Sequence, residues 1–322
     1  MPQKIDVSHK TIIFITFFIL TLWVTFLIRD LIVILFVAVI FVSALSPMVN
    51  FLIRLRLPKV LSIIITYIII IAILSGLIIS IIPPLITESN RLIVASPPLI
   101  AQFFNITNID KSVFSSGVTS ISKNLFSITI ALFDNLLTII FLLVITFYLL
   151  LDKENLENRI ASLFKSREER IRRSIVKIEE KLGAWLRGQL VLSLLIGTLS
   201  YIGLTILGIP YALPLALIAG AMEVIPVIGP IVSAIPAIFI ALTISPLLGV
   251  MVAGMYLIIQ QLENSLIVPQ VMKRAVGLNP LIVILAIAIG SRLLGISGAL
   301  LAVPIAVVFQ IIAAEVIEGK EA

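Results

Sequence analysis

Long apolar runs separated by short charged stretches dominate the first half of the sequence. The first four runs cover residues 11–28, 31–53, 60–82 and 126–151, the last of which contains Asp134. Apolar runs of about 18 residues or more are long enough to cross a bilayer as helices. Residues 1–151 are therefore predicted to hold four membrane helices.

Two polar segments interrupt this pattern. Residues 85–125 are rich in Ser, Thr, Asn and Pro, and we expect short helices on one membrane face there. Residues 152–187 are dense in charge, yet apolar residues recur at steps of four and three: Ile171, Ile175, Ile178, Leu182 and Trp185. This spacing predicts an amphipathic helix at the membrane surface or against a neighbouring helix. A solvated linker with an apolar seam is the plainer alternative.

Positive charges indicate which way the first half faces. Lys and Arg gather in residues 1–10, 54–59 and 152–187, and four crossings bring all three clusters to one side. Because positive loops stay in the cytoplasm, the N-terminus and residues 152–187 are predicted to be cytoplasmic. Residues 85–125 are then extracytoplasmic.

The second half, residues 188–316, is apolar but rich in proline and glycine, and residues 317–322 form a tail. Residues 188–222 and 224–262 are charge-free and longer than one ordinary span. Pro and Gly break membrane helices where the freed backbone groups line a cavity or are buried in protein. The predicted breaks or gating positions are Pro226, Gly229, Pro230, Pro236, Pro269, Gly290, Gly295, Gly298 and Pro304. Whether residues 226–246 and 281–316 span or re-enter stays open.

Three ionisable residues lie within or beside these apolar runs, namely Glu223, Glu263 and Arg292. Charged groups at membrane depth are unfavourable and usually mark pathways, ion pairs or proton relays. We expect Glu223 and Arg292 to face one another or a shared polar cavity. The alternative is that these groups lie solvated at the membrane interface.

Four amides accompany them: Gln189, Gln260, Gln261 and Asn264. Neutral hydrogen-bonding groups of this kind suit a hydroxylated solute. A single amide in a membrane helix more commonly bonds to a neighbouring helix, and this reading applies to each of the four.

Composition excludes several other classes of protein. Hydrophobic residues make up 60% of the 322 and charged residues 12%, with a mean hydropathy of +1.23, so a water-soluble fold is excluded. The net charge of +6 reflects cytoplasmic loops better than nucleic-acid binding. One histidine, no cysteine and no phosphate-binding or nucleophile motif argue against an enzyme, a metal site and a cofactor.

The second half contains several distinctive motifs: Arg187-Gly188-Gln189, Glu223-Val224-Ile225-Pro226-Val227-Ile228-Gly229-Pro230, Gln261-Leu262-Glu263-Asn264, Val268-Pro269-Gln270-Val271-Met272, Val276-Gly277-Leu278-Asn279-Pro280 and Gly298-Ala299-Leu300-Leu301-Ala302-Val303-Pro304. These motifs resemble those of the autoinducer-2 exporter (AI-2E) family of transporters. The resemblance covers nearly the whole chain, by motif in the second half and by pattern in the first.

The resemblance implies an all-α polytopic membrane protein with about eight transmembrane helices. It implies a homo-oligomer, a pentamer in the family, in a prokaryotic cytoplasmic membrane. The implied function is export of a small solute such as autoinducer-2 by alternating access, with coupling to H⁺ or Na⁺. Sodium–proton exchange is the alternative within the family, and Glu223 is the best candidate for the protonatable or cation-binding group. A channel or a non-transporting membrane scaffold remains an alternative function of another class.

Overall fold

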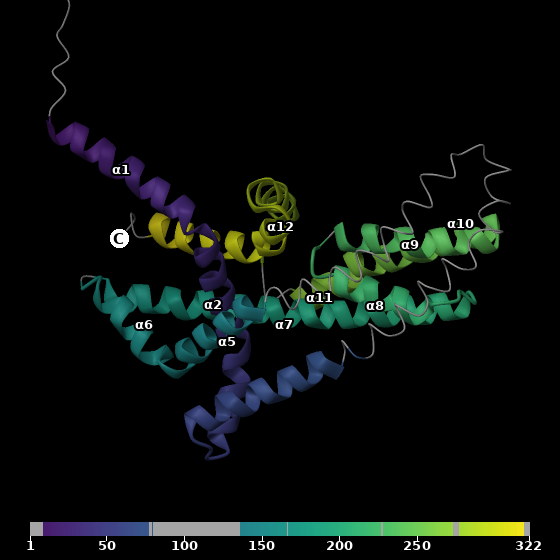
Figure 1. Ribbon diagram of the computed structural model, residues 1–322, viewed down its shortest axis with the longest axis horizontal. Coiled ribbons are helices and arrows are strands. Elements are labelled where there is room, and N and C mark those ends of the chain that lie inside the picture. The colour runs from purple at the N-terminus through teal and green to yellow at the C-terminus, as the bar shows by residue number, and fades with distance from the viewer. Residues whose placement is uncertain are drawn as a thin grey trace, which may run out of the picture.

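The computed structural model describes residues 9–76, 79, 136–165, 167–226, 228–272 and 277–318 (Figure 1). No strand occurs in these ranges, which confirms the predicted all-α class. The helices are α1 (His9–Leu27), α2 (Arg29–Arg54), α5 (Leu136–Leu151), α6 (Lys153–Ser162), α7 (Glu168–Ile206), α8 (Ala212–Met222), α9 (Ile228–Ile244), α10 (Pro246–Leu262), η1 (Glu263–Ile267), α11 (Val268–Met272) and α12 (Pro280–Glu318). A further helix covers Lys59–Gly76.

Six of these helices are long and apolar enough to cross a membrane, or seven if the bent pair α5 and α6 is one span. The protein is therefore a multi-pass membrane protein. The extracytoplasmic segment expected at 85–125 and most of the tail lie outside the described residues. A total of about eight helices stays a prediction.

The N-terminal helices pack around one small apolar cluster. Val42 and Val49 of α2 meet Ile63 of the Lys59–Gly76 helix and Leu150 of α5. By contrast, α1 extends away from the rest of the chain (Figure 1), and its large apolar side chains are exposed. Such a surface suits a helix surrounded by lipid.

The charged segment 152–187 is two helices in the structure rather than one. It contains α6 and the first half of α7, and α7 continues without a break into the apolar half of the chain. We treat the apolar half of α7, residues 188–206, as its membrane-spanning part. The predicted seam packs inward, because Ile178, Leu182 and Trp185 join a cluster with α2 and α12.

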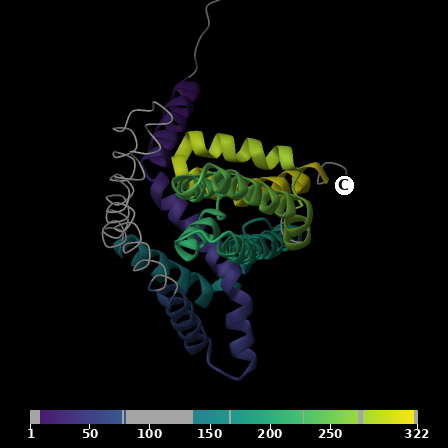
Figure 2. The ribbon, with the colours of Figure 1, turned by 90° about the vertical axis from the view of Figure 1, so that its right-hand side faces the viewer.

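Helices α7, α8, α9 and α10 form a second packed unit, seen nearly end-on in Figure 2. Its core includes Leu204 of α7, Leu215 of α8, Ala241 of α9 and Val252 of α10. A Cβ at Gly220 of α8 would crowd the carbonyl oxygen of Ser193, so the two helices touch through their backbones. Small residues of this kind permit close packing of membrane helices.

Helix α12 bends sharply in its middle, at Gly295, which has a φ of 62°. A Cβ at Gly290 would collide with the carbonyl of Gly298. In a straight helix residues eight apart lie about 12 Å apart along the axis, so the chain must fold back here. Leu278 before α12 packs near Trp185, and Glu315 near its end pairs with Arg170 at 3.3 Å. The start and the end of residues 281–316 therefore both lie beside the charged half of α7.

Candidate functional site

Glu223 lies in the turn between α8 and α9. We call residues Glu223–Pro226 the tip. Pro226 and Pro230 lack the amide hydrogen that a continuous helix requires. The tip is held by turns instead, with Ile225 N donating to Met222 O at 3.0 Å and Gly229 N to Ile225 O at 2.9 Å. A Cβ at Gly229 would collide with the Met222 carbonyl, so only glycine fits there. The predicted break at this position is thus a tight reversal.

Gln189 of α7 fixes the tip to the neighbouring helix. Its side chain is 1% exposed, and its Nε2 donates to the backbone carbonyl of Glu223 at 2.6 Å. A carbonyl released from helical bonding is commonly satisfied by a neighbouring side chain in a membrane protein. The amide therefore acts as the link between α7 and the tip, which is one of the two roles expected from the sequence.

Glu263 begins the π-helix η1, directly after α10. Its side chain is 3% exposed, and that of Glu223 is 1% exposed. A π-helical turn is rare and is often found at functional sites, where it redirects a side chain out of regular α-helical register. Helix α10 therefore delivers its carboxylate into the protein interior at an irregular point of the backbone.

Glu223 and Glu263 form what we call the carboxylate pair, because the two groups interact electrostatically. The Oε2 atom of each is buried and has no hydrogen-bond partner among the described residues. Within the described ranges no Lys, Arg or His forms a salt bridge with either group. Two buried carboxylates of this kind require a compensating cation, such as a proton or a metal ion.

Arg292 does not supply that charge in the structure. Its side chain is exposed on the first arm of α12, and no ion pair joins it to Glu223 among the described residues. The structure therefore bonds Gln189 to Glu223 and places Glu263 within electrostatic range of Glu223. The expected pairing of Glu223 with Arg292 is not seen among the described residues, and the interaction with Glu263 was not predicted.

The remaining predicted residues are spread around this centre. Gln260 is half-buried, whereas Gln261 and Asn264 are exposed, and Gln261 donates to Ser265 Oγ at 3.1 Å. Pro236 lies inside α9, Pro269 inside α11 and Pro304 inside the second arm of α12. Gly290, Gly295 and Gly298 form the bend of α12. A role for these residues in transport stays a prediction.

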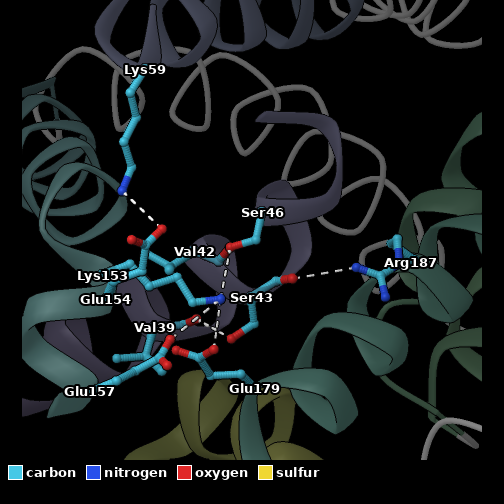
Figure 3. A network of polar contacts seen from close by, with 10 residues as sticks. All are labelled: Val39, Val42, Ser43, Ser46, Lys59, Lys153, Glu154, Glu157, Glu179 and Arg187. Atoms are coloured by element: carbon cyan, nitrogen blue, oxygen red, sulfur yellow. Dashed lines mark hydrogen bonds and ion pairs between the residues drawn. The ribbon is translucent and has the colours of Figure 1, made fainter. Parts of the chain in front are cut away.

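A second polar region, which we call the charged network, lies where α2, α6 and α7 meet (Figure 3). Lys153 Nζ contacts Glu179 at 2.7 Å, Glu157 at 3.8 Å and Ser46 Oγ at 3.4 Å. Burial raises the pKa of Glu179 above its ordinary value, and the neighbouring Lys153 opposes this rise. One lysine thus links three helices. The sequence showed the charge in this segment but not which groups would meet.

Arg187 extends the charged network to a proline bend in α2. Pro47 has no amide hydrogen, so the carbonyl of Ser43 loses its helical donor. Arg187 Nη1 lies 3.4 Å from that oxygen and 3.3 Å from the carbonyl of Ala44. A Cβ at Gly183 would collide with the same Ser43 carbonyl. Helices α2 and α7 therefore cross in close contact here, beside a hollow of about 620 Å³ lined by both helices and α6.

The sequence model of the AI-2E family of transporters matches residues 12–318. The chain is 34% identical over 168 residues to "Putative transport protein" YrrI of Bacillus subtilis (strain 168), covering 52% of this chain and 48% of that protein. It is 28% identical over 287 residues to YueF of the same strain, which has the same description, covering 81% of this chain and 77% of that protein.

A third relative has a named substrate. The AI-2 transport protein TqsA of Escherichia coli (strain K12) is 28% identical over 180 residues, covering 55% of this chain and 52% of that protein. The matched parts of YrrI and TqsA are thus about half of their lengths. The names of these relatives describe transporters rather than enzymes.

Proposed function

The chain belongs to the AI-2E family of transporters, and from that premise we propose that it exports a small solute by alternating access. We place it in a prokaryotic cytoplasmic membrane, with the N-terminus and residues 152–187 in the cytoplasm. The proposed cargo is an autoinducer-2-like, hydroxylated molecule, as the name of TqsA suggests for that relative. The proposed assembly is a homo-oligomer.

The carboxylate pair is the observation that carries this proposal. Transport against a gradient requires a coupling ion, and a buried acidic pair without a basic partner is suited to bind and release H⁺ or Na⁺. Its position on the tip and on a π-helical turn supports the same role, because irregular backbone at a membrane-buried site is where transporters hold ions. Binding of a cation would favour one arrangement of the tip against α7, and release would favour the other.

Sodium–proton exchange without an organic solute is the second candidate. The carboxylate pair favours it, because two interacting acids can bind Na⁺ and protons in competition. Neither function requires a further cofactor.

The test uses purified protein in liposomes, with an imposed sodium gradient and a pH dye inside. An exchanger should show sodium-dependent proton movement that falls at least tenfold in Glu223→Gln and in Glu263→Gln, whereas a solute exporter should show none in the absence of its cargo. The matched control is Glu168→Gln, which removes an exposed carboxylate at the start of α7 and should transport like the parent. Thermal midpoints of all four proteins distinguish lost transport from lost folding.

A second assay measures efflux of autoinducer-2 from the same liposomes, with and without the sodium or proton gradient. Gradient-driven efflux that Glu223→Gln abolishes is the result we expect. Proton movement without efflux would select the exchanger. Efflux or exchange that both Gln variants leave unchanged would exclude the carboxylate pair as the coupling site.

A further inference from the structure

Two serines of α7 and a tyrosine of α10 continue the polar surface beyond the carboxylate pair. Ser193 and Ser200 follow Gln189 by four and eleven residues, which places all three on one face of the helix. At 1.5 Å per residue, the stretch from Gln189 to Ser200 is about 16 Å long. We call Ser193, Ser200 and Tyr256 the hydroxyl stripe.

The packing of α7 against α10 brings this stripe and the carboxylate pair together. Helix α10 and its continuation into α11 run antiparallel to α7, with Met255 of α10 against Gly203 and Met272 of α11 against Gly188. This register places Glu263 near the level of Ile196, between Ser193 and Ser200. It also brings the Tyr256 hydroxyl beside Ser200, the deepest member of the stripe.

Hydroxyls elsewhere in the described helices behave differently. Several Ser and Thr side chains donate to the carbonyl four residues earlier, which is the usual local solution in an apolar helix. They include Ser43, Ser46, Thr66, Thr146 and Thr198, at 2.7 to 2.8 Å. Within the described residues, the hydroxyls of Ser193, Ser200 and Tyr256 make no such bond to a backbone carbonyl, although those of Ser200 and Tyr256 face each other. Since buried polar groups are nearly always satisfied, these three are suited to bonding with water.

The far end of the stripe is closed by apolar side chains. Leu204 and Val252 are fully buried and pack in the core cluster of the α7–α10 unit, one turn beyond Ser200 and Tyr256. Polar groups therefore run from the carboxylate pair to a hydrophobic seal, and end there.

We propose that the hydroxyl stripe lines a water-filled arm of the transport site, and that protons pass along it between the carboxylate pair and the far side of the Leu204–Val252 seal when that seal opens. The assignment rests on the proposed function, since the carboxylate pair is its inner terminus. Hydroxyl groups and water can pass a proton along a chain of hydrogen bonds, whereas an apolar helix interface cannot. Ser193, Ser200 and Tyr256 thereby become positioning residues for the water chain.

Single-cysteine labelling tests whether the arm contains water, because the natural chain has no cysteine. A methanethiosulfonate reagent (2-aminoethyl methanethiosulfonate) reacts with thiolates, which form only where water reaches them. We expect Ser193→Cys and Ser200→Cys to react at least tenfold faster than Ala241→Cys. Ala241 is an equally buried small residue in the apolar core of the same unit. Equal rates at Ser200 and Ala241 would overturn the proposal.

Tyr256→Phe provides a second measurement that does not depend on a cysteine. Removal of one hydroxyl should slow sodium-dependent proton movement about tenfold, while Phe retains the packing of the ring. A Tyr256→Phe protein that moves protons at the parent rate would count against the stripe. If the parent itself moves no protons but the cysteines still label selectively, the water-filled arm stands and sodium–proton exchange fails.

Discussion

Polar groups beside the two halves of helix α7 are in opposite states. Next to the charged half, Lys153 of α6 meets two carboxylates and a hydroxyl, and Arg187 of α7 meets two carbonyls. Next to the apolar half, the carboxylate pair has no basic partner and the hydroxyl stripe has no backbone partner among the described residues. The deeper groups are thus the less satisfied ones, although burial makes an unsatisfied group more unfavourable.

This difference separates a structural role from a functional one. Paired charges fix α2, α6 and α7 relative to one another, because breaking a pair leaves a partly buried charge without a partner. Unpaired groups hold nothing together and are available for exchange with water, ions or solute. Three substitutions test the contrast, beginning with the one expected to have the largest effect.

Gly229→Ala should disrupt the unpaired region most strongly. The new Cβ would collide with the Met222 carbonyl and crowd Glu223 N at 3.0 Å, so the tip must shift. We expect a loss of about 3 kcal/mol in stability and at least a tenfold loss of transport. Gly254→Ala on α10 is the control, since no atom lies within 4 Å of its Cβ, and it should be neutral or slightly stabilising. Similar transport in both variants would contradict the proposed geometry of the tip.

Lys153→Met should convert the paired region into an unpaired one. Glu157 and Glu179 have side-chain exposures of only 15% and 16%, so the variant should lose about 2 kcal/mol at pH 7.5. Lys177→Met, which changes an exposed lysine of α7, should lose little. Scanning fluorimetry on Trp185, which lies in the adjacent cluster, reports the midpoint.

The loss caused by Lys153→Met should depend on pH. Burial raises the folded pKa of Glu179, so its contribution to stability is present at acid pH and disappears as pH rises through that value. Lys153 offsets the loss at neutral pH, and its removal should raise the pKa of Glu179 further. The variant should therefore be nearer to the parent at pH 5 than at pH 7.5. Equal deficits at both values would show that the charge of Glu179 is not what Lys153 compensates.

Arg187→Gln should have the smallest effect, about 1 kcal/mol, because its hydrogen bonds are long. The effect should shrink in a Pro47→Ala background, where residue 47 regains an amide hydrogen that can donate to the Ser43 carbonyl. Midpoints of the parent, both single variants and the double variant complete the cycle. Additive losses would mean that Arg187 does not act on the carbonyl that Pro47 releases.

Local signals in the sequence predicted most of the elements and part of the site. Apolar runs predicted the helices, Pro226 and Gly229 predicted the break, and the isolation of Glu223 and Gln189 in apolar sequence marked them as unusual. Each of these properties can be read within one turn of the residue concerned.

The partners of these residues depend on packing between distant segments. Glu223 lies within electrostatic range of Glu263 because α8 and α10 both pack on α7, whereas the bend at Gly295 leaves Arg292 on an exposed arm. The sequence does not mark Ser193 and Ser200 as unusual, because a hydroxyl side chain in an apolar helix usually bonds to its own backbone, as that of Thr198 does. They differ from the other hydroxyls in that they do not make this local bond, which only the packed structure shows.

The contact between Gly183 and Ser43 lies much nearer to Gln189 than to the C-terminal end of α7. From this crossing, Gln189 is six residues away and Ile206 is 23 residues away, or about 9 Å and 35 Å along a rigid helix. A tilt of about ten degrees about the crossing would displace Gln189 by roughly 1.5 Å and Ile206 by roughly 6 Å. Movement of the charged half would then leave the Gln189–Glu223 hydrogen bond within reach of adjustment while it swings the opposite end of the helix. A pivot at this point would combine a nearly stationary ion site with a mobile outer end.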